Sequence, residues 1–280
     1  MSSTLNDPVL AIPEAQASGD VAALYEDIRG TLGVPVVNLI WRHLAAIPGA
    51  LDWAWASLKP AYQSGAIADQ AYALRGSLVL PSDVCLDSSE LAAAGLSASD
   101  MESIEFVLRA YERSNAMNLV ALAALLAGLN KVAPNENEIA NGKADSAALI
   151  GVMPGLPPIS TMPDPLRALV EDLNELGGQT VILPTMYRHL SHWPAFLALV
   201  YGLLAPLDAD ARLQGLISEV VIAGHIRGAS VCGQLARPAS VIEGDVEALT
   251  RGALVQFLHG PLAKMTVIVG VVRQAMPQRT

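Results

Sequence analysis

The sequence predicts an all-α protein, built as an internally duplicated helical pseudo-dimer. Of its 280 residues 52% are hydrophobic but only 5% are aromatic, and the abundant Ala and Leu are strong helix formers. The motif aromatic-Arg-His-Leu-x-x-x-Pro-x-x-Leu occurs twice, beginning at Trp41 and at Tyr187, so the shift is 187 − 41 = 146 residues. A solenoid unit is much shorter, roughly 20–50 residues. We therefore expect two similar helical lobes with a seam between them, where pockets tend to form.

Capping and helix-breaking residues divide the first half into segments. Ser97 and Asp100 form a capping sequence in front of a long apolar pattern, and Pro48 and Pro81 interrupt the pattern before it. We expect a bend in the long helix at Ser114-Asn115. The predicted helices are 21–32, 37–46, 49–64, 67–80, 88–95 and 101–129.

A proline-rich stretch separates the two halves. Prolines such as Pro154, Pro157 and Pro158 remove backbone donors and favour extended geometry, so this stretch is predicted to be a linker. The helical pattern then restarts, with predicted helices at 166–176, 184–192, 196–204, 208–223, 243–259 and 262–274. The predicted organisation is a first repeat over 1–133, a linker over 134–165 and a second repeat over 166–280.

Charge and motifs restrict the class of function. A formal net charge of −10 argues against nucleic acid as a partner. Cys85 and Cys232 form no C-x-x-C pair, which argues against a zinc site or redox dithiol and predicts two free, buried thiols in a reducing cytosol. Residues 1–7 do not resemble a signal peptide, and the apolar run 116–129 is too short to cross a bilayer. We expect a soluble cytoplasmic protein that has no membrane partner and no dinucleotide or P-loop cofactor site.

Several strings resemble the group I 2-haloacid dehalogenases, which act on both D- and L-2-haloalkanoic acids. These are Leu-Tyr-Glu-Asp-Ile-Arg at 24–29, Pro48-Gly49-x-Leu51, and Trp193-Pro194. The resemblance covers nearly the whole chain. It implies an all-helical pseudo-dimer, related in topology to carboxymuconolactone decarboxylase-like proteins, with the site between the lobes. It also implies a mechanism in which an Asp activates water, and the water displaces halide directly from carbon 2.

Transfer of the family's site residues onto this sequence implies altered chemistry. The catalytic Asp falls on Met186, the Ser before it on Thr185, and the water-binding Asn on Asn115. A methionine cannot accept a proton, and loss of a general base typically costs 10²–10⁴-fold in rate. The family's other pocket positions fall on aliphatic residues: Val36, Leu39, Leu258 and Leu262. The implied pocket is therefore apolar.

Two ionisable residues are candidates to replace the missing base. Glu112 lies three residues before Asn115, so both point to one helix face, and a shift of 147 pairs Glu112 with His259 in the second half. Glu and His commonly serve as acid and base. The alternative interpretation is a surface Glu and a helix-end His. Tyr111, beside Glu112, is either a hydroxyl donor at the seam or a core residue.

Two further histidines, His43 and His189, occupy equivalent positions in the repeat. Their recurrence predicts a structural task, such as a hydrogen bond to a carbonyl that a nearby proline leaves unpaired. We predict no metal site, because no carboxylate lies at ligand spacing from either histidine.

Three hypotheses of function follow. The first is a hydrolase that acts on a carbon–heteroatom bond of a small, largely apolar substrate in the inter-lobe pocket, with Asn115, Glu112 and His259 as catalytic residues. The second is a non-hydrolytic pocket protein, either a hydrophobic ligand binder or a cyclase-like enzyme that holds a reactive substrate in one conformation. The third is a scaffold whose apolar face serves contact between copies, as in a homodimer.

Overall fold

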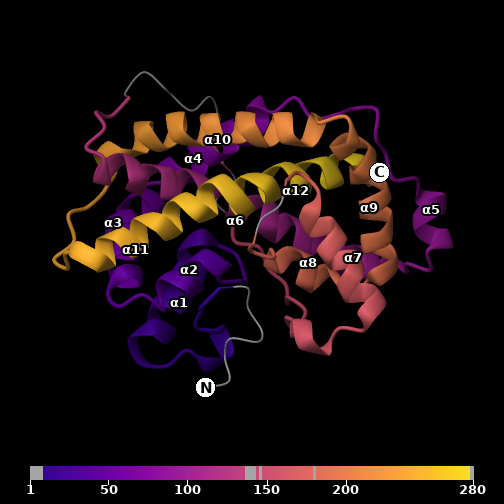
Figure 1. Cartoon of the computed structure of the whole chain (residues 1–280), viewed down its shortest axis with the longest axis horizontal. Helices are drawn as coiled ribbons and strands as arrows, with labels where there is room; N and C mark the ends of the chain where they lie inside the picture. Colours follow the sequence, from indigo (N-terminus) through magenta and orange to yellow (C-terminus); the bar gives the residue numbers. More distant parts are fainter. Residues whose placement is uncertain (1–8, 136–142, 145–146, 179–180, 278–280) are drawn as a thin grey trace.

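A computed structural model describes residues 9–135, 143–144, 147–178 and 181–277, and within these ranges the secondary structure is entirely helical (Figure 1). The prediction of an all-α fold is therefore confirmed. Parts of the predicted linker, including Asn137 and Asn141, lie outside the described residues, as do residues 1–7. The first series of helices is α1 (Gly19–Leu32), α2 (Leu39–Leu44), α3 (Ala50–Gln63), α4 (Ala66–Ser77), α5 (Ser88–Ala93) and α6 (Ala98–Leu129).

The second series contains the helices that follow the proline-rich stretch. It comprises α7 (Asp164–Glu175), α8 (Thr185–Leu190), α9 (Pro194–Ala209), α10 (Arg212–Val231), α11 (Gly244–Phe257) and α12 (Ala263–Ala275), with the π-helical segment η4 (Leu258–Leu262) between the last two. Three short 3-10 helices are η1 (Glu14–Gln16), η2 (Ile159–Thr161) and η3 (Cys232–Gln234).

Several helix starts correspond between the two series at a shift of 146 residues. The starts of α2 and α8 differ by 185 − 39 = 146 residues, and those of α6 and α11 by 244 − 98 = 146. Both α3 and α9 contain an internal proline, Pro60 and Pro206, which are again 146 residues apart. The correspondence is one of bounds along the chain, and the duplication with its domain limits stays a prediction.

Helix α6 forms the centre of the molecule. It begins with the predicted capping box, in which the Ser97 side chain accepts a hydrogen bond from the Asp100 backbone N–H and the Asp100 carboxylate accepts one from the Ser97 backbone N–H. Every residue from Ser114 to Ala127 is buried, and such burial on all sides is typical of a core helix. Helices α4, α10 and α12 pack against it (Figure 1). The approach of α10 requires Gly228, because a Cβ there would lie 2.4 Å from the Cβ of Ala123.

The predicted bend at Ser114-Asn115 was wrong, because α6 runs unbroken through both residues. The interruption occurs at the corresponding place in the second series, where Gly260 has non-helical angles (φ −106°, ψ −107°) and Pro261 follows. Proline has no backbone N–H and obstructs the preceding turn, so the helical hydrogen-bond ladder widens there. Asn115 keeps an N–H and imposes no such break.

The cysteines are free, as predicted, but Cys85 is exposed and Cys232 only half-buried. The expectation that both thiols are buried was therefore wrong. Cys85 lies in the connection between α4 and α5 rather than in a packed helix.

Two helical stretches have the length and composition of membrane-spanning helices, Arg212–Gln234 and Gly244–Ala275. The second is 72% buried within the protein and the first 28%. Core helices of soluble proteins meet the same criteria, so the predicted cytoplasmic location stays a prediction.

Candidate active site

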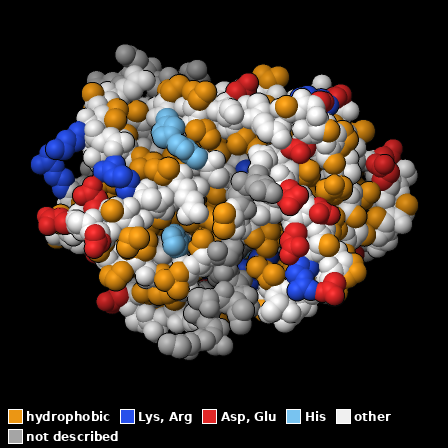
Figure 2. Space-filling model, in the orientation of Figure 1, with side chains coloured by type: hydrophobic (Ala, Val, Ile, Leu, Met, Phe, Trp, Pro, Cys, Tyr) orange, Lys and Arg blue, Asp and Glu red, His pale blue; other side chains and the backbone are white. Residues whose placement is uncertain are grey.

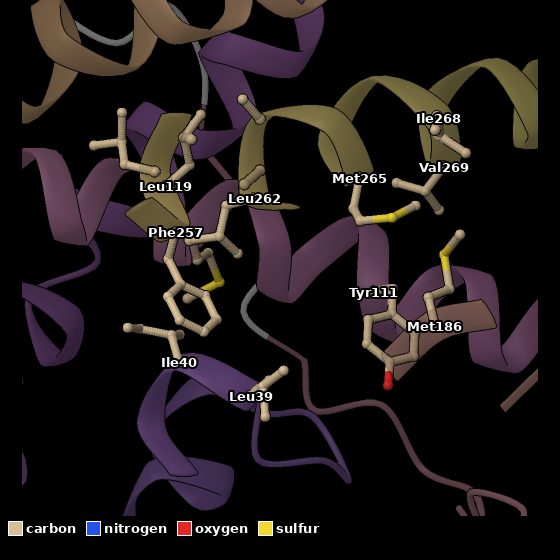
Figure 3. Packing of buried hydrophobic residues seen from close by; sticks show 14 of the residues in the cluster. Leu39, Ile40, Tyr111, Leu119, Met186, Phe257, Leu262, Met265, Ile268 and Val269 are labelled. Carbon is tan, nitrogen blue, oxygen red and sulfur yellow. The ribbon is translucent and has the colours of Figure 1, made fainter. Parts of the chain in front are cut away.

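A small cavity of about 30 Å³ lies where the two series of helices meet. Side chains from α2, α6, α8, α11, η4 and α12 line it, and all of its lining residues are buried. Figure 3 shows Leu39 and Ile40 from α2 on one side and Met186 on the other, below Leu262 and Met265. The lining residues are Asn38, Leu39, Ile40, Tyr111, Asn115, Ile182, Pro184, Thr185, Met186, Phe257, Pro261, Leu262 and Met265.

The two series contribute corresponding positions to this lining. Each first-series residue has a lining counterpart 146 residues later; the pairs are Asn38 with Pro184, Leu39 with Thr185, Ile40 with Met186, Tyr111 with Phe257, and Asn115 with Pro261. The cavity is therefore lined by segments of both series, while the duplication itself stays a prediction. Of the paired positions, most of the polar side chains come from the first series.

Two buried asparagines meet in the cavity wall. Asn38 Nδ2 donates to Ser114 Oγ at 3.0 Å and to Asn115 Oδ1 at 3.3 Å. Their remaining polar atoms, Asn38 Oδ1 and Asn115 Nδ2, are buried and have no hydrogen-bond partner within the described part of the chain. A buried polar group without a partner costs about 1–3 kcal/mol, so these atoms are suited to hold a polar ligand or water.

A tyrosine–histidine pair crosses the seam beside the asparagines. The Tyr111 hydroxyl lies 2.7 Å from His189 Nδ1, and both side chains are buried. Burial, assisted by the charges of Arg188 and Arg42, lowers the pKa of His189 to about 3. Burial raises the pKa of Tyr111, and the Thr185 side chain, within hydrogen-bond reach, opposes part of that rise. At neutral pH the histidine is therefore an uncharged imidazole that can accept a proton.

A larger outer pocket of about 340 Å³ adjoins the cavity. Thr185 lines both spaces, and His189 lines the outer one. The outer pocket also contains Arg42 and Arg188, and Arg188 donates from Nε and Nη2 to the carbonyl of Pro157 at 3.0 and 2.9 Å. These guanidinium groups make the outer pocket suitable for a carboxylate.

The predicted pocket residues divide into three groups by position. The cavity wall contains Leu39, Tyr111, Asn115, Thr185, Met186 and Leu262. Val36 lines the outer pocket instead. Leu258 is buried in η4 but is not a lining residue of either space.

The structure does not bring Glu112 and His259 to Asn115. The Glu112 carboxylate pairs with Arg273, and its backbone carbonyl accepts from Arg75 at 3.2 Å. His259 is exposed and hydrogen-bonds His225. The prediction paired the two halves one residue out of register. The matching helix starts differ by 146 residues rather than 147, so the counterpart of Glu112 is Leu258 and not His259.

The repeat predicts a structural role for His189, such as a hydrogen bond to a carbonyl, without identifying its partner. Its counterpart His43 does bond a carbonyl, that of Leu10 at 2.6 Å, but His189 faces Tyr111. The repeat singles out both histidines by their equivalent positions. Tyr111, however, is 78 residues away from His189 in sequence, so their contact is seen only in the folded structure. Among the described residues no group of three or more His, Cys, Asp or Glu side chains could hold a metal ion.

Comparisons with known proteins agree with this fold. The chain is 30% identical over 112 residues to an (R)-2-haloacid dehalogenase of Pseudomonas putida, a match to 38% of this chain and only 37% of the relative. It is 27% identical over 221 residues to a configuration-inverting 2-haloacid dehalogenase of Alcaligenes xylosoxydans xylosoxydans, covering 75% of this chain and 73% of that one. No family model matches the chain.

Solved structures extend the similarity to the whole fold. A D-2-haloacid dehalogenase in complex with L-LA has a TM-score of 0.68 at 17% identity, covering 95% of this chain and 96% of that one. A mutant of a D-2-haloacid dehalogenase with D-2-CPA gives 0.66 with the same coverage. Sequence and fold together support a divergent haloacid-dehalogenase-like family for this chain.

Proposed function

We propose that this chain is a dehalogenase-like hydrolase that displaces a leaving group from a small, largely apolar substrate, which binds in the outer pocket with its reacting carbon at the seam cavity. One observation supports this above all others. The cavity contains unpartnered amide atoms and adjoins a buried Tyr111–His189 pair, while no Asp or Glu occurs among its lining residues. The related proteins named above are 2-haloacid dehalogenases, so small 2-haloacids are the first substrates to test.

Water fits the space between the two amides. A cavity of about 30 Å³ is large enough for one water molecule, which requires two or more polar partners. Asn115 Nδ2 would donate to the water oxygen, and Asn38 Oδ1 would accept one of its protons. The bound water would thus present its lone pair to a substrate carbon that enters from the outer pocket.

The proton acceptor in this proposal is His189. The water oxygen bonds to the substrate carbon as the carbon–halogen bond breaks, and halide leaves with the electron pair. The water proton passes through the hydroxyls of Thr185 and Tyr111 to His189 Nδ1, which becomes an imidazolium. With a pKa of about 3, His189 has nearly the basicity of a free aspartate, which titrates near pH 4. It could therefore take the role of the carboxylate that the family resemblance assigns to position 186.

The outer pocket suits the acid group of such a substrate. Arg42 and Arg188 place positive charge there, and the one carboxylate among the lining residues, that of Glu14, is paired with Arg29. The cavity beyond the two arginines is walled by Ile40, Met186 and Met265. A short chain with a carboxylate at one end and an apolar carbon at the other matches this change in polarity.

Halide release tests the proposal. Purified parent protein is incubated with each enantiomer of 2-chloropropionate and of 2-bromobutyrate, and Asn115→Ala is assayed beside it. We expect release by the parent and a drop of about 10-fold or more in the variant, since Asn115 holds the water. Release that is absent, or equal in both proteins, would contradict the proposal.

The apolar wall also favours a second candidate, a pocket protein that binds a hydrophobic molecule without hydrolysis. It predicts an apolar ligand that co-purifies and that His189→Gln leaves bound. Native mass spectrometry and solvent extraction of the parent distinguish the two candidates. If nothing is bound, the second candidate is excluded.

A further inference from the structure

Two exposed histidines from different elements meet on the surface behind the cavity. His225 of α10 and His259 of η4 have their Nε2 atoms 2.8 Å apart. The ring planes are at 74° to each other, with centroids 5.1 Å apart. Both side chains are exposed, and Figure 2 shows histidine side chains gathered on the upper part of this face.

We propose that His225 and His259 form a chelating site for a divalent transition-metal ion such as Ni²⁺, Cu²⁺ or Zn²⁺. Imidazole nitrogens are preferred ligands of these ions, with metal–nitrogen distances of about 2.0–2.1 Å. Two such nitrogens in adjacent positions of a square-planar or octahedral ion lie about 2.9 Å apart. The observed separation of 2.8 Å is close to this value. In the structure the two Nε2 atoms face each other along the shared hydrogen bond. Both rings must therefore turn, with little change in the distance between the nitrogens, for their lone pairs to converge on an ion.

Metal binding at this pair requires uncharged rings, because only an uncharged imidazole offers a lone pair to a metal. Water or small anions would supply the remaining ligands, since no third His, Cys, Asp or Glu joins the pair within the described part of the chain.

The site connects to the cavity through η4. His259 lies on the outer side of this π-helical segment, while Pro261 and Leu262 of the same segment line the cavity. Gly260 has non-helical angles, so this is the least regular point of the α11–α12 helix. An ion held by both histidines would tie η4 to α10 and fix the cavity wall. This inference does not depend on the proposed hydrolysis.

Calorimetric titration with NiCl₂ alone tests the site. We expect the parent to bind one equivalent, and His225→Gln and His259→Gln each to lose affinity by about 100-fold or more, because the second bond of a chelate is intramolecular. His192→Gln is the matched control, since His192 is also exposed but bonds the carbonyl of Gly155 at 2.7 Å. It should bind Ni²⁺ as the parent does.

A second readout is thermal stability. Ni²⁺ at 100 times its dissociation constant should stabilise the parent by about 2.7 kcal/mol, and should leave the melting temperatures of both chelate variants unchanged. Circular dichroism without metal checks that all variants fold. Binding that persists in both chelate variants, or that His192→Gln abolishes, would overturn the proposal.

Discussion

The two walls of the cavity come from corresponding segments but differ in chemistry. The first series supplies Asn38, Tyr111 and Asn115, where the second has Pro184, Phe257 and Pro261 146 residues later. The second wall thus lines the cavity at the same positions as the first but has fewer hydrogen-bonding side chains. Thr185 is the exception, since its counterpart in the first wall is the apolar Leu39. The difference indicates that bonds to water or substrate come mainly from the first wall, while the second wall contributes a proton acceptor from behind, His189.

The repeated histidines show the same divergence. His43 bonds the carbonyl of Leu10 and stacks on Phe257, with ring centroids 5.6 Å apart. His189 bonds the Tyr111 hydroxyl in a buried setting. His43 thus makes a structural contact, while His189 faces ionisable groups at the seam. Comparison of the two histidines therefore separates catalytic from structural effects.

The largest expected effect is on turnover. Replacement of His189 by Gln removes the proton acceptor but keeps a side chain that can bond Tyr111. We expect halide release to fall by about 10²–10⁴-fold, the usual contribution of a general base. Steady-state kinetics should show the loss mainly in kcat rather than KM. His43→Gln is the matched control and should retain the rate of the parent; equal losses in both variants would contradict the assignment.

The next effect is on stability as a function of pH. His189 is held neutral in the fold, with a pKa lowered from 6.5 to about 3, so protonation favours the unfolded chain. The free energy of unfolding therefore contains the full contribution of the uncharged His189 above pH 6.5, and this contribution is lost as the pH falls towards 3. Between pH 7.5 and 5 the free energy of unfolding should fall by about 2 kcal/mol more in the parent than in His189→Gln.

Urea unfolding at both pH values measures this difference, because other titrating groups cancel between the two proteins. His43→Gln should behave as the parent does. A difference near zero would show that His189 is not held neutral by the seam.

The smallest expected effect is on the pH–rate profile. Since His189 stays unprotonated down to about pH 3, kcat should change little between pH 7.5 and 5. An exposed histidine as base would instead lose activity below its ordinary pKa of about 6.5. Initial rates, measured where circular dichroism shows the fold intact, decide between these cases. A midpoint near 6.5 would favour a base outside the seam.

Local sequence determined much of the fold and little of the site. The capping box at Ser97 and Asp100 and the break at Pro261 act within a few residues, so both were predictable. The repeat placed the seam, because its shift matches the helix bounds. Continuity of α6 through Asn115 was not predictable from sequence, since burial on all sides decides it.

Side-chain partners across the seam were beyond sequence reasoning. The Glu112 carboxylate binds Arg273, which lies 161 residues later in the sequence. The Tyr111 hydroxyl hydrogen-bonds His189, which lies 78 residues later. A register change of one residue, from 147 to 146, exchanges Leu258 for His259 as the counterpart of Glu112. Neighbouring residues of a helix point about 100° apart, so an error of one residue in the repeat pairs Glu112 with an exposed side chain instead of a buried one.

The central claim is that His189 accepts the proton that a carboxylate at position 186 would otherwise take. The most direct measurement is halide release from 2-chloropropionate by His189→Gln and by the double variant His189→Gln/Met186→Asp. We expect the single variant to lose about 10²-fold or more in rate, and the added carboxylate to restore most of the loss. Undiminished release by His189→Gln, or a folded double variant that recovers nothing, would contradict it.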